Sequence, residues 1–452
     1  MDHWVTKAVF YHIYPLGLCG APRHNDFSAP QVDRLSVLHS WLGHIEDLGA
    51  NAIYLGPVFE SSTHGYDTAD YTRVDRRLGS NESLASFSSA VHSRGLRLIL
   101  DGVFNHVGRD FWAFRDLLAN GEGSRYASWF HSVAFGRKSP YGDPFSYEGW
   151  NGHFSLVKLD LSNTEVREHI FNAVSSWIGD YGIDGLRLDA ADVMDVDFLK
   201  DLAAHCRRAR PDFWLLGEVV HGDYRRWANP QTLDSVTNYE CYKGLYSSHV
   251  DRNYFEIAYA LNRQFGPAGV YRGLPLYAFA DNHDVNRVAS MLRESRHLHT
   301  VYCLLFTMPG VPSLYYGSEW GIDGKKDGSD WPLRPSLDLE ALTRTAPHPE
   351  LVGTIRRLAG IRQGSEPLRR GEYFQLHVSH EQLAFARRHA GRTVVVCINA
   401  SREAARITLE IPGAGEGRLV DLLNRGDEFS VLAGKAVIDP VPAGWARILE
   451  LR

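Results

Sequence analysis

The chain has 452 residues, of which 44% are hydrophobic, 23% charged and 12% aromatic, and its formal net charge is −6 at pH 7. This length exceeds that of one ordinary domain, so we expect a large core with attached smaller units. The composition is that of a globular protein, and the weak negative charge argues against nucleic acid or a membrane surface as partners.

The cysteines and the apolar stretches bear on cellular location. The five cysteines are widely spaced without a CxxC pair, which predicts free buried thiols; they are Cys19, Cys206, Cys241, Cys303 and Cys397. His12 and Pro15 interrupt the first apolar segment, which argues against a signal peptide. Residues 300–317 come nearest to a membrane span but contain Pro309 and Pro312. We therefore expect a cytoplasmic protein, and the sequence leaves open whether it is a monomer or a homodimer.

Short apolar runs alternate along the chain with amphipathic segments, a pattern typical of repeated βα units and a parallel sheet. Several runs are apolar on both faces, as strands between layers of helices should be. The eight expected strands are Phe10–Tyr14, Ala52–Leu55, Leu96–Val103, Gly185–Asp189, Trp214–Gly217, Ser235–Asn238, Leu276–Phe279 and Ser313–Tyr316. Asn163 and Glu165 predict the capped start of a helix over Val166–Tyr181, which Gly182 ends. This pattern predicts a (β/α)8 TIM barrel in the α/β class.

Two segments depart from the βα pattern. The connection between the third and fourth strands is far longer than a βα unit needs, and its first two-thirds are rich in aromatic residues, glycine and serine. After Leu368, alternation with period two and Gly/Asn/Asp turns predict a small antiparallel β-sandwich. We therefore expect barrel segments at 1–106 and 159–367, an inserted domain at 107–158 and a C-terminal sandwich at 368–452.

Polar residues gather at the carboxyl ends of four expected strands. The motifs are Asp101-Gly-Val-Phe-Asn105-His106, Arg187-Leu-Asp189, Gly217-Glu218 and Asn282-His283-Asp284. In a (β/α)8 barrel the carboxyl ends of the strands form the catalytic face, so these side chains should converge. Each motif alone has a structural explanation: a buried Asp–Arg pair, a helix cap at Glu218, or a structural histidine. Their joint occurrence in this order favours a catalytic site.

Together these motifs resemble the α-amylase family, glycoside hydrolase family 13, over roughly residues 5–365. The segment Leu156-Val-Lys-Leu159, with Gly217-Glu218-Val-Val-His221, is most similar to the maltogenic amylase, neopullulanase and cyclomaltodextrinase group. The resemblance implies a retaining hydrolase of α-1,4-glucosidic bonds in starch or maltooligosaccharides that releases maltose and other short products through a covalent glycosyl-enzyme intermediate.

The resemblance also implies a role for each site residue. Asp189 would be the nucleophile, kept ionised by Arg187, and Glu218 the general acid/base, with a pKa raised by its apolar surroundings. Asp284 is the third catalytic carboxylate. The residues expected to bind substrate are Tyr66, Asp67, His106, Arg187, His283, Asp330 and Arg334. Tyr66 would stack beneath the reacting sugar, and Asp330 with Arg334 would contact the next sugar.

No cofactor is expected to be required. Asp192 and Val193 stand where α-amylases have a Lys-His pair that supplies a calcium ligand, so these residues do not support a structural calcium site, although Asn105 is present. Two alternatives stay open. A 4-α-glucanotransferase or another α-transglycosidase would use the same carboxylates but exclude water. A non-catalytic carbohydrate-binding protein should have lost a carboxylate, and this chain keeps them all.

Overall fold

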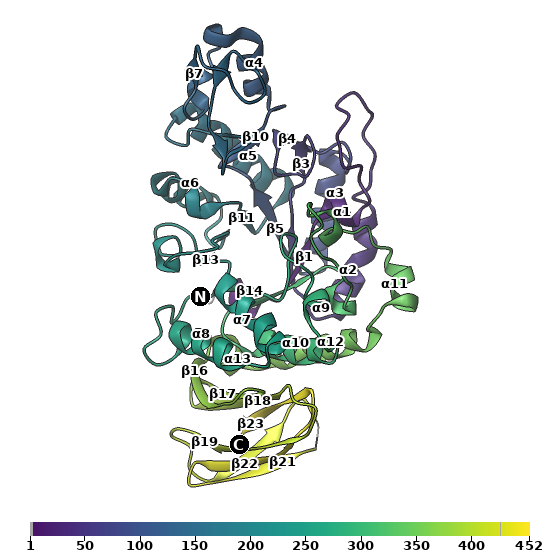
Figure 1. The fold of residues 1–452 in the computed structure, drawn as a ribbon, viewed down its shortest axis with the longest axis vertical. Helices are drawn as coiled ribbons and strands as arrows, with labels where there is room; N and C mark the ends of the chain where they lie inside the picture. The colour runs from purple at the N-terminus through teal and green to yellow at the C-terminus, as the bar shows by residue number, and fades with distance from the viewer. Residues whose placement is uncertain (1–2, 425) are drawn as a thin grey trace.

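The computed structural model describes residues 3–424 and 426–452, and its centre is an eight-stranded parallel sheet (Figure 1). The strands are β1 (Phe10–Ile13), β2 (Ala52–Leu55), β5 (Arg97–Gly102), β11 (Gly185–Leu188), β12 (Trp214–Gly217), β13 (Ser235–Val236), β14 (Tyr277–Phe279) and β15 (Val311–Tyr315). They follow the order β13-β12-β11-β5-β2-β1-β15-β14. A parallel bridge between Thr237 and Tyr277 joins the two edges, so the sheet closes into the predicted barrel.

All eight predicted barrel strands are present; β2 and β12 have the predicted ends, and the ends of the others differ by one or two residues. The sixth is shorter than expected, since only Ser235 and Val236 pair with β12 before the chain turns. The eighth begins at Val311 rather than Ser313 and includes Pro312. Proline is tolerated at the start of a strand, where the missing N–H costs little. Strands β1, β2, β11, β12, β14 and β15 are buried along their whole length, as expected for strands with apolar residues on both faces.

Helices surround the barrel. They are α1 (Pro15–Leu18), α2 (Val37–Asp47), α3 (Asn81–Ser93), α5 (Thr164–Tyr181), α6 (Val196–Ala209), α7 (Tyr239–Val250), α8 (Phe255–Phe265), α9 (Val288–Met291), α10 (His297–Thr307), α11 (Leu339–Thr345), α12 (Pro349–Gly364) and α13 (Glu366–Arg370). Helix α5 begins as predicted, because the Asn163 side chain accepts from the backbone N–H groups of Glu165 and Val166. It ends at Gly182, whose φ of 60° favours glycine.

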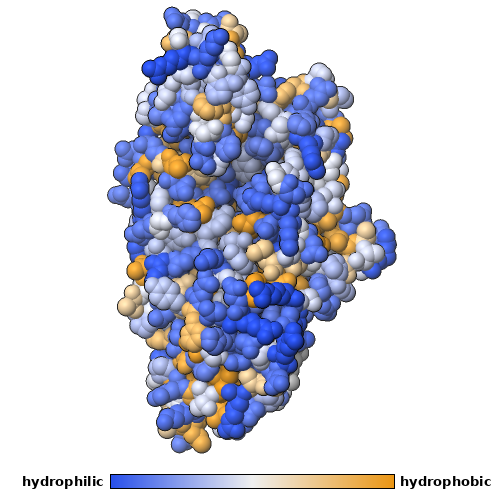
Figure 2. All heavy atoms as spheres, in the orientation of Figure 1, coloured by the Kyte–Doolittle hydropathy of each residue, from blue (hydrophilic) through white to orange (hydrophobic). Residues whose placement is uncertain are grey.

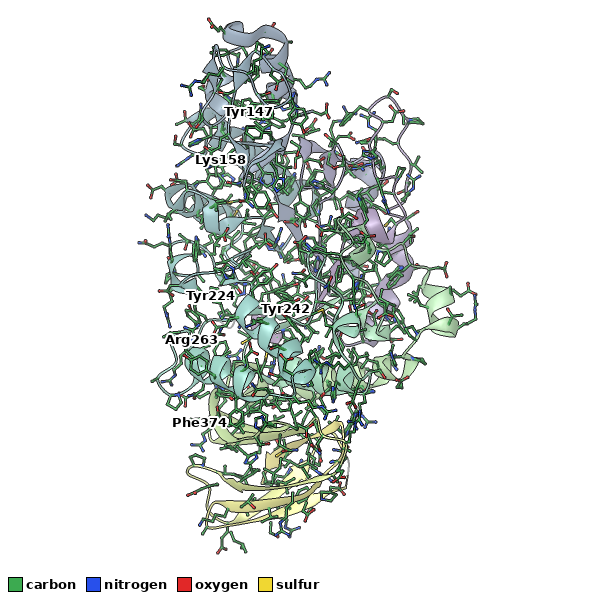
Figure 3. All side chains as sticks on the ribbon, viewed as in Figure 1. Tyr147, Lys158, Tyr224, Tyr242, Arg263 and Phe374 are labelled. Atoms are coloured by element: carbon green, nitrogen blue, oxygen red, sulfur yellow. The ribbon has the colours of Figure 1, made fainter. Side chains whose placement is uncertain are left out.

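The long third connection leaves the barrel and forms a separate layered unit beyond its rim (Figure 1). It contains β6 (His106–Gly108), α4 (Trp112–Asn120), β7 (Ala134–Phe135), β8 (Phe145–Ser146), β9 (Gly149–Trp150) and β10 (His153–Lys158). Its aromatic side chains pack on one another: Phe114 contacts Phe130, Phe145 and Tyr147 edge to face. Tyr147 lies in this unit and Lys158 near its junction with the barrel (Figure 3). A second hairpin, β3 (Phe59–Ser61) with β4 (Thr68–Val74), follows β2.

The C-terminal part is an antiparallel sheet at the opposite end of the molecule (Figure 1). Its strands are β16 (Glu372–Val378), β17 (Gln382–His389), β18 (Arg392–Asn399), β19 (Ala405–Glu410), β20 (Gly417–Asp421), β21 (Glu428–Leu432), β22 (Lys435–Val441) and β23 (Trp445–Leu451). The sheet folds over its own buried core, which includes Val395, Ile407 and Leu449. The predicted sandwich is confirmed, and the limits given for the four segments stay a prediction.

All five cysteines are free and buried, as predicted. No helix within residues 3–424 and 426–452 is long and apolar enough to cross a membrane. Hydrophilic side chains dominate the face seen in Figure 2, with hydrophobic ones scattered among them.

Candidate active site

A cavity of about 620 Å³ opens at the carboxyl ends of the barrel strands. Among the predicted site residues, those that line it are Tyr66, His106, Asp189, Glu218, Asp284, Asp330 and Arg334. Further lining side chains come from the loops and from the inserted unit; they include His64, Trp150, Tyr239 and Lys326. The structure therefore brings together motifs that lie more than 200 residues apart in the chain, at the end of the barrel where catalysis is expected.

Arg187 is the charged centre of this site. Its Nη1 lies 2.9 Å from Asp101 Oδ1 and 2.8 Å from Asp189 Oδ1, while its Nη2 lies 2.7 Å from Glu218 Oε2. The guanidinium is buried, so each of these contacts is strong and directional. One cation thus fixes three carboxylates. The contact with Asp101 follows from strand register, since β11 and β5 pair Arg187 with Asp101.

Asp189 follows β11 and lies in the floor of the cavity. Burial raises the pKa of its carboxyl well above the usual range, the Arg187 charge opposes this shift, and the carboxylates of Glu218 and Asp101 add to it. His106 lies beside it, with Nε2 at 3.8 Å from Asp189 Oδ2. Burial lowers the pKa of His106 to about 3, so its ring is neutral near pH 7. This buried Nε2 has no hydrogen-bond partner among the described residues, and His106 is one of the residues that line the cavity.

Glu218 follows β12 directly and is held from two sides besides Arg187. The backbone N–H of Ala190 donates to Oε2 across 3.1 Å, and the Tyr239 hydroxyl donates to Oε1 across 3.3 Å. Ala190 has a φ of 49°, a left-handed conformation that is costly for a residue other than glycine. This strained turn directs the Ala190 N–H toward the carboxylate of Glu218, immediately after Asp189.

The carboxylate of Asp284 is held by the imidazole of His283 and the guanidinium of Arg334. His283 Nε2 lies 2.9 Å from Oδ2, and Arg334 Nη2 lies 2.9 Å from Oδ1. Burial alone would raise the pKa of Asp284, but His283, Arg334 and Arg187 together lower it below its usual range. Arg334 also contacts Asp330 at 3.3 Å, so the predicted Asp330–Arg334 pair exists and extends to the third carboxylate.

Tyr66 forms one wall of the cavity. Its ring stacks on His283 at 5.4 Å between centroids, and its hydroxyl donates to Asp101 Oδ2 and contacts His283 Nε2. Asp67 has a different environment: its Oδ2 accepts from Thr63 Oγ1 across 2.6 Å, and the residue does not line the cavity. His283 lies behind Tyr66 and Asp284 rather than on the cavity surface.

Sequence reasoning missed several lining residues. Tyr239 begins helix α7 after the sixth strand, and Lys326 reaches Asp330 Oδ1 at 2.8 Å from a loop. Only their positions after barrel strands could have marked them. Trp150, from the inserted unit, also lines the cavity, and its ring stacks on His106 at 5.3 Å. The described residues contain no cluster of three or more His, Cys, Asp or Glu side chains that could hold a metal. That no cofactor is required stays a prediction.

This fold and site define a class. A (β/α)8 barrel that presents two carboxyl groups on one guanidinium in a cavity, with a third nearby, has the apparatus of an enzyme that cleaves glycosidic bonds. The model of the alpha amylase catalytic domain matches residues 34–352 of the chain. The chain therefore belongs to the α-amylase family and is a glycoside hydrolase, as predicted.

Individual proteins with similar sequences or structures have names consistent with this family. A cyclomaltodextrinase from Geobacillus thermopakistaniensis is 28% identical over 474 residues, which covers 98% of this chain and 76% of the relative. An intracellular maltogenic amylase from Bacillus subtilis is 29% identical over 344 residues, covering 72% of this chain and 57% of the relative. Among solved structures, a cyclic α-maltosyl-(1→6)-maltose hydrolase from Arthrobacter globiformis superposes with a TM-score of 0.83 at 26% identity, covering 100% of each chain.

Proposed function

We propose that the protein is a retaining α-glucan hydrolase that cleaves α-1,4-glucosidic bonds in starch or maltooligosaccharides and releases maltose and other short products. One observation carries the proposal: Asp189 and Glu218 bind the two terminal nitrogens of the same guanidinium. Retaining glycosidases need two carboxyl groups only about 5 to 5.5 Å apart, whereas inverting enzymes leave room for a water between them. A shared guanidinium favours the close, retaining arrangement.

In the first step Asp189 attacks the anomeric carbon and forms a covalent bond to it. The bond to the leaving oxygen breaks, and Glu218 gives that oxygen its proton. In the second step Glu218, now ionised, takes a proton from water, and the resulting hydroxide displaces Asp189 from the anomeric carbon. Two inversions return the product in the α configuration. Over the cycle the bond to Asp189 forms and breaks, the glycosidic bond is replaced by a bond to the oxygen of water, and Glu218 regains the proton it gave to the leaving oxygen.

The other side chains serve binding and orientation. Arg187 opposes the effect of burial on Asp189 and holds its carboxylate toward the sugar. Asp284, ionised through its contacts with His283 and Arg334, accepts hydrogen bonds from sugar hydroxyls. The neutral His106 offers its unpartnered Nε2 to the same sugar. Tyr66 presents an aromatic wall that favours the positive charge developing at the anomeric carbon.

The substrate class and the location are supported by the relatives. The printed names of several, including cyclomaltodextrinase, maltogenic amylase and neopullulanase, denote enzymes that act on α-glucans. One of these relatives is named as intracellular, which supports a cytoplasmic location. We take an α-glucan or a maltooligosaccharide as the partner in the cleft, and neither a nucleic acid nor a membrane.

A product time course tests the proposal. Wild type and Asp189→Asn are incubated with maltoheptaose and with soluble starch, and the anomeric form of new reducing ends is followed by NMR. Short α-anomeric products from wild type and none from the variant are expected. Products longer than maltoheptaose would indicate a transglycosidase instead. β-Anomeric products would refute the retaining mechanism. If the wild-type protein releases no products from either substrate, the α-glucan assignment is wrong.

A further inference from the structure

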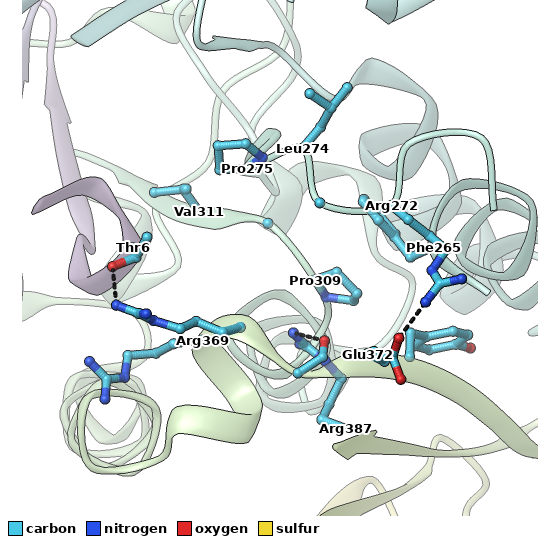
Figure 4. A pocket seen from close by; sticks show the side chains of 15 residues that line it. Thr6, Phe265, Arg272, Leu274, Pro275, Pro309, Val311, Arg369, Glu372 and Arg387 are labelled. Carbon is cyan, nitrogen blue, oxygen red and sulfur yellow. Dashed lines mark hydrogen bonds and ion pairs between the residues drawn. The ribbon is translucent and has the colours of Figure 1, made fainter. Parts of the chain in front are cut away.

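A second cavity, of about 590 Å³, lies at the opposite end of the barrel from the active site. Leu274 and Pro275 lead into β14 and Pro309 leads into β15, so these lining residues belong to the amino ends of the strands. The other side is formed by α13 and by the first strands of the C-terminal sheet. In Figure 4, Thr6 and Arg369 lie on one side and Arg272 with Glu372 on the other. The volume lies in the range of small-molecule sites.

The charge of this cavity is strongly positive. Four arginines line it, together with a single carboxylate, that of Glu372. The arginines are Arg272, Arg369, Arg370 and Arg387. Glu372 forms an ion pair with Arg272 at the open edge, where both side chains are about half exposed. Arg369 and Arg387 therefore bring guanidinium charge to a cavity in which Glu372 is the one carboxylate among the described lining residues.

Arg387 is the most deeply buried of these cations. Its guanidinium donates to Thr307 O across 2.7 Å and to Gly371 O across 3.0 and 3.2 Å, and each acceptor is a neutral carbonyl. A guanidinium has five N–H donors, so these three bonds leave capacity for further acceptors. Burial of a cation that only neutral carbonyls contact is unfavourable in a medium of low dielectric constant, and an approaching anion would reduce that cost.

Two other arginines bring like charge close to Arg387: Arg369 of the lining, and Arg362, which lies outside it. Arg362 packs behind Arg387 and also donates only to backbone carbonyls, among them Phe306 O at 2.9 Å. Burial and the Arg369 charge lower the pKa of Arg362 to about 9, and burial and the Arg362 charge lower the pKa of Arg387 in turn. Arg369 Nε is buried with no hydrogen-bond partner among the residues that the structure describes. Three like charges thus repel one another beside a cavity.

We propose that this cavity binds a phosphate-bearing small metabolite, whose phosphate group is held by Arg369 and Arg387. Arginine forms paired hydrogen bonds with phosphate oxygens, and a dianion would relieve the repulsion among the buried cations. The apolar side chains of Leu274, Pro309 and Val311 would contact the remainder of the ligand. Because the walls come from both the barrel and the C-terminal sheet, the bound anion would also strengthen the attachment of the sheet to the barrel.

Calorimetric titration at low ionic strength tests the site independently of activity. The probes are inorganic phosphate and glucose 6-phosphate, with glucose as the uncharged control. We expect both anions to bind wild type and to raise its melting temperature, while glucose does neither. Tighter binding of the sugar phosphate would identify a phosphorylated metabolite as the ligand; equal affinity would identify free phosphate. If neither anion binds, the proposal is wrong.

Matched variants locate the binding. Arg272→Gln with Arg369→Gln removes one arginine assigned to the phosphate and one at the cavity edge, and should weaken phosphate binding at least tenfold. Arg406→Gln with Arg418→Gln removes equal charge from exposed positions of the C-terminal sheet and should change it less than twofold. If both double variants lose phosphate affinity equally, the loss comes from net charge alone and the proposal is wrong. Glu372→Gln, a change at a half-exposed residue, should tighten binding several-fold because it removes the carboxylate that the described lining contains and so its repulsion of an anion. Unchanged or weaker binding in that variant would also contradict the site.

Discussion

The Tyr239 hydroxyl donates a hydrogen bond to Glu218 Oε1 across 3.3 Å and so links the end of the sixth strand to the end of the fifth. Asn282 Nδ2 donates to the same hydroxyl across 3.2 Å, and Asn282 Oδ1 accepts from the backbone N–H of Asp284. Tyr239 thereby connects the proposed acid/base with the loop that carries the third carboxylate. We regard it as a positioning residue.

Removal of the Tyr239 hydroxyl should slow turnover more than it weakens binding. In Tyr239→Phe the ring remains but the carboxylate of Glu218 loses one of its two hydrogen-bond donors besides Arg187. We expect kcat on maltoheptaose to fall about tenfold, equivalent to about 1.4 kcal/mol of activation free energy, while KM changes less than twofold. Tyr242→Phe is the control, because its ring contacts Tyr239 in the same helix without bonding to Glu218. Equal losses in the two variants would contradict this role.

Arg187 should matter for both catalysis and stability. Arg187→Met leaves the buried carboxylates of Asp101 and Asp189, and the partly buried one of Glu218, without their shared cation, so we expect the free energy of unfolding to fall by about 3 to 5 kcal/mol. kcat/KM should fall by roughly 10²- to 10³-fold, the range for loss of a fixed charge at the reacting centre. Urea denaturation and steady-state kinetics measure these two effects. A fully active variant would show that the carboxylates are oriented by other contacts.

The raised pKa of Asp189 sets the acidic limit of activity. The nucleophile must be ionised, so activity is lost as the pH falls through its pKa, and a raised pKa moves this loss toward neutral pH. We expect the acidic limb of kcat/KM to lie above the ordinary aspartate value of 3.8. Arg187→Lys, if it folds, should move the limb further toward neutral pH, because the ammonium cannot contact all three carboxylates as the guanidinium does. A wild-type limb at or below pH 3.8 would contradict the assignment.

The barrel was predictable because a short strand that is buried on both faces consists almost entirely of uncharged residues, and such a run is easily recognised in a sequence. The runs Ala52–Leu55 and Trp214–Gly217 contain no charged residue, and both form strands with the predicted ends. In the C-terminal sandwich β18 is buried along most of its length, but other strands alternate between buried and exposed residues, and this alternation made the sandwich predictable. The run Ala405–Glu410 is an example.

The contacts inside the site were less predictable. Arg187 and Asp189 lie two residues apart on one strand, so their pairing follows from strand geometry. The contact between Arg187 and Asp101 depends on the register between β11 and β5, which no local pattern encodes. The Asp67 carboxylate accepts from Thr63 within the loop that joins β3 to β4, and a motif alone does not specify that contact.

Trp150 should determine how well longer substrates bind. It is contributed by the inserted unit, lines the cavity and stacks on His106 at 5.3 Å. In Trp150→Ala the substrate loses an aromatic face worth about 1 kcal/mol, so we expect KM for maltoheptaose to rise roughly fivefold, with a smaller change in kcat. Tyr141→Ala is the matched control: this tyrosine belongs to the same unit but is 57% exposed and packs on Arg109 outside the cavity. A rise in KM in both variants would mean that the inserted unit acts through its folding, whereas a rise in Trp150→Ala alone places its contribution at the sugar.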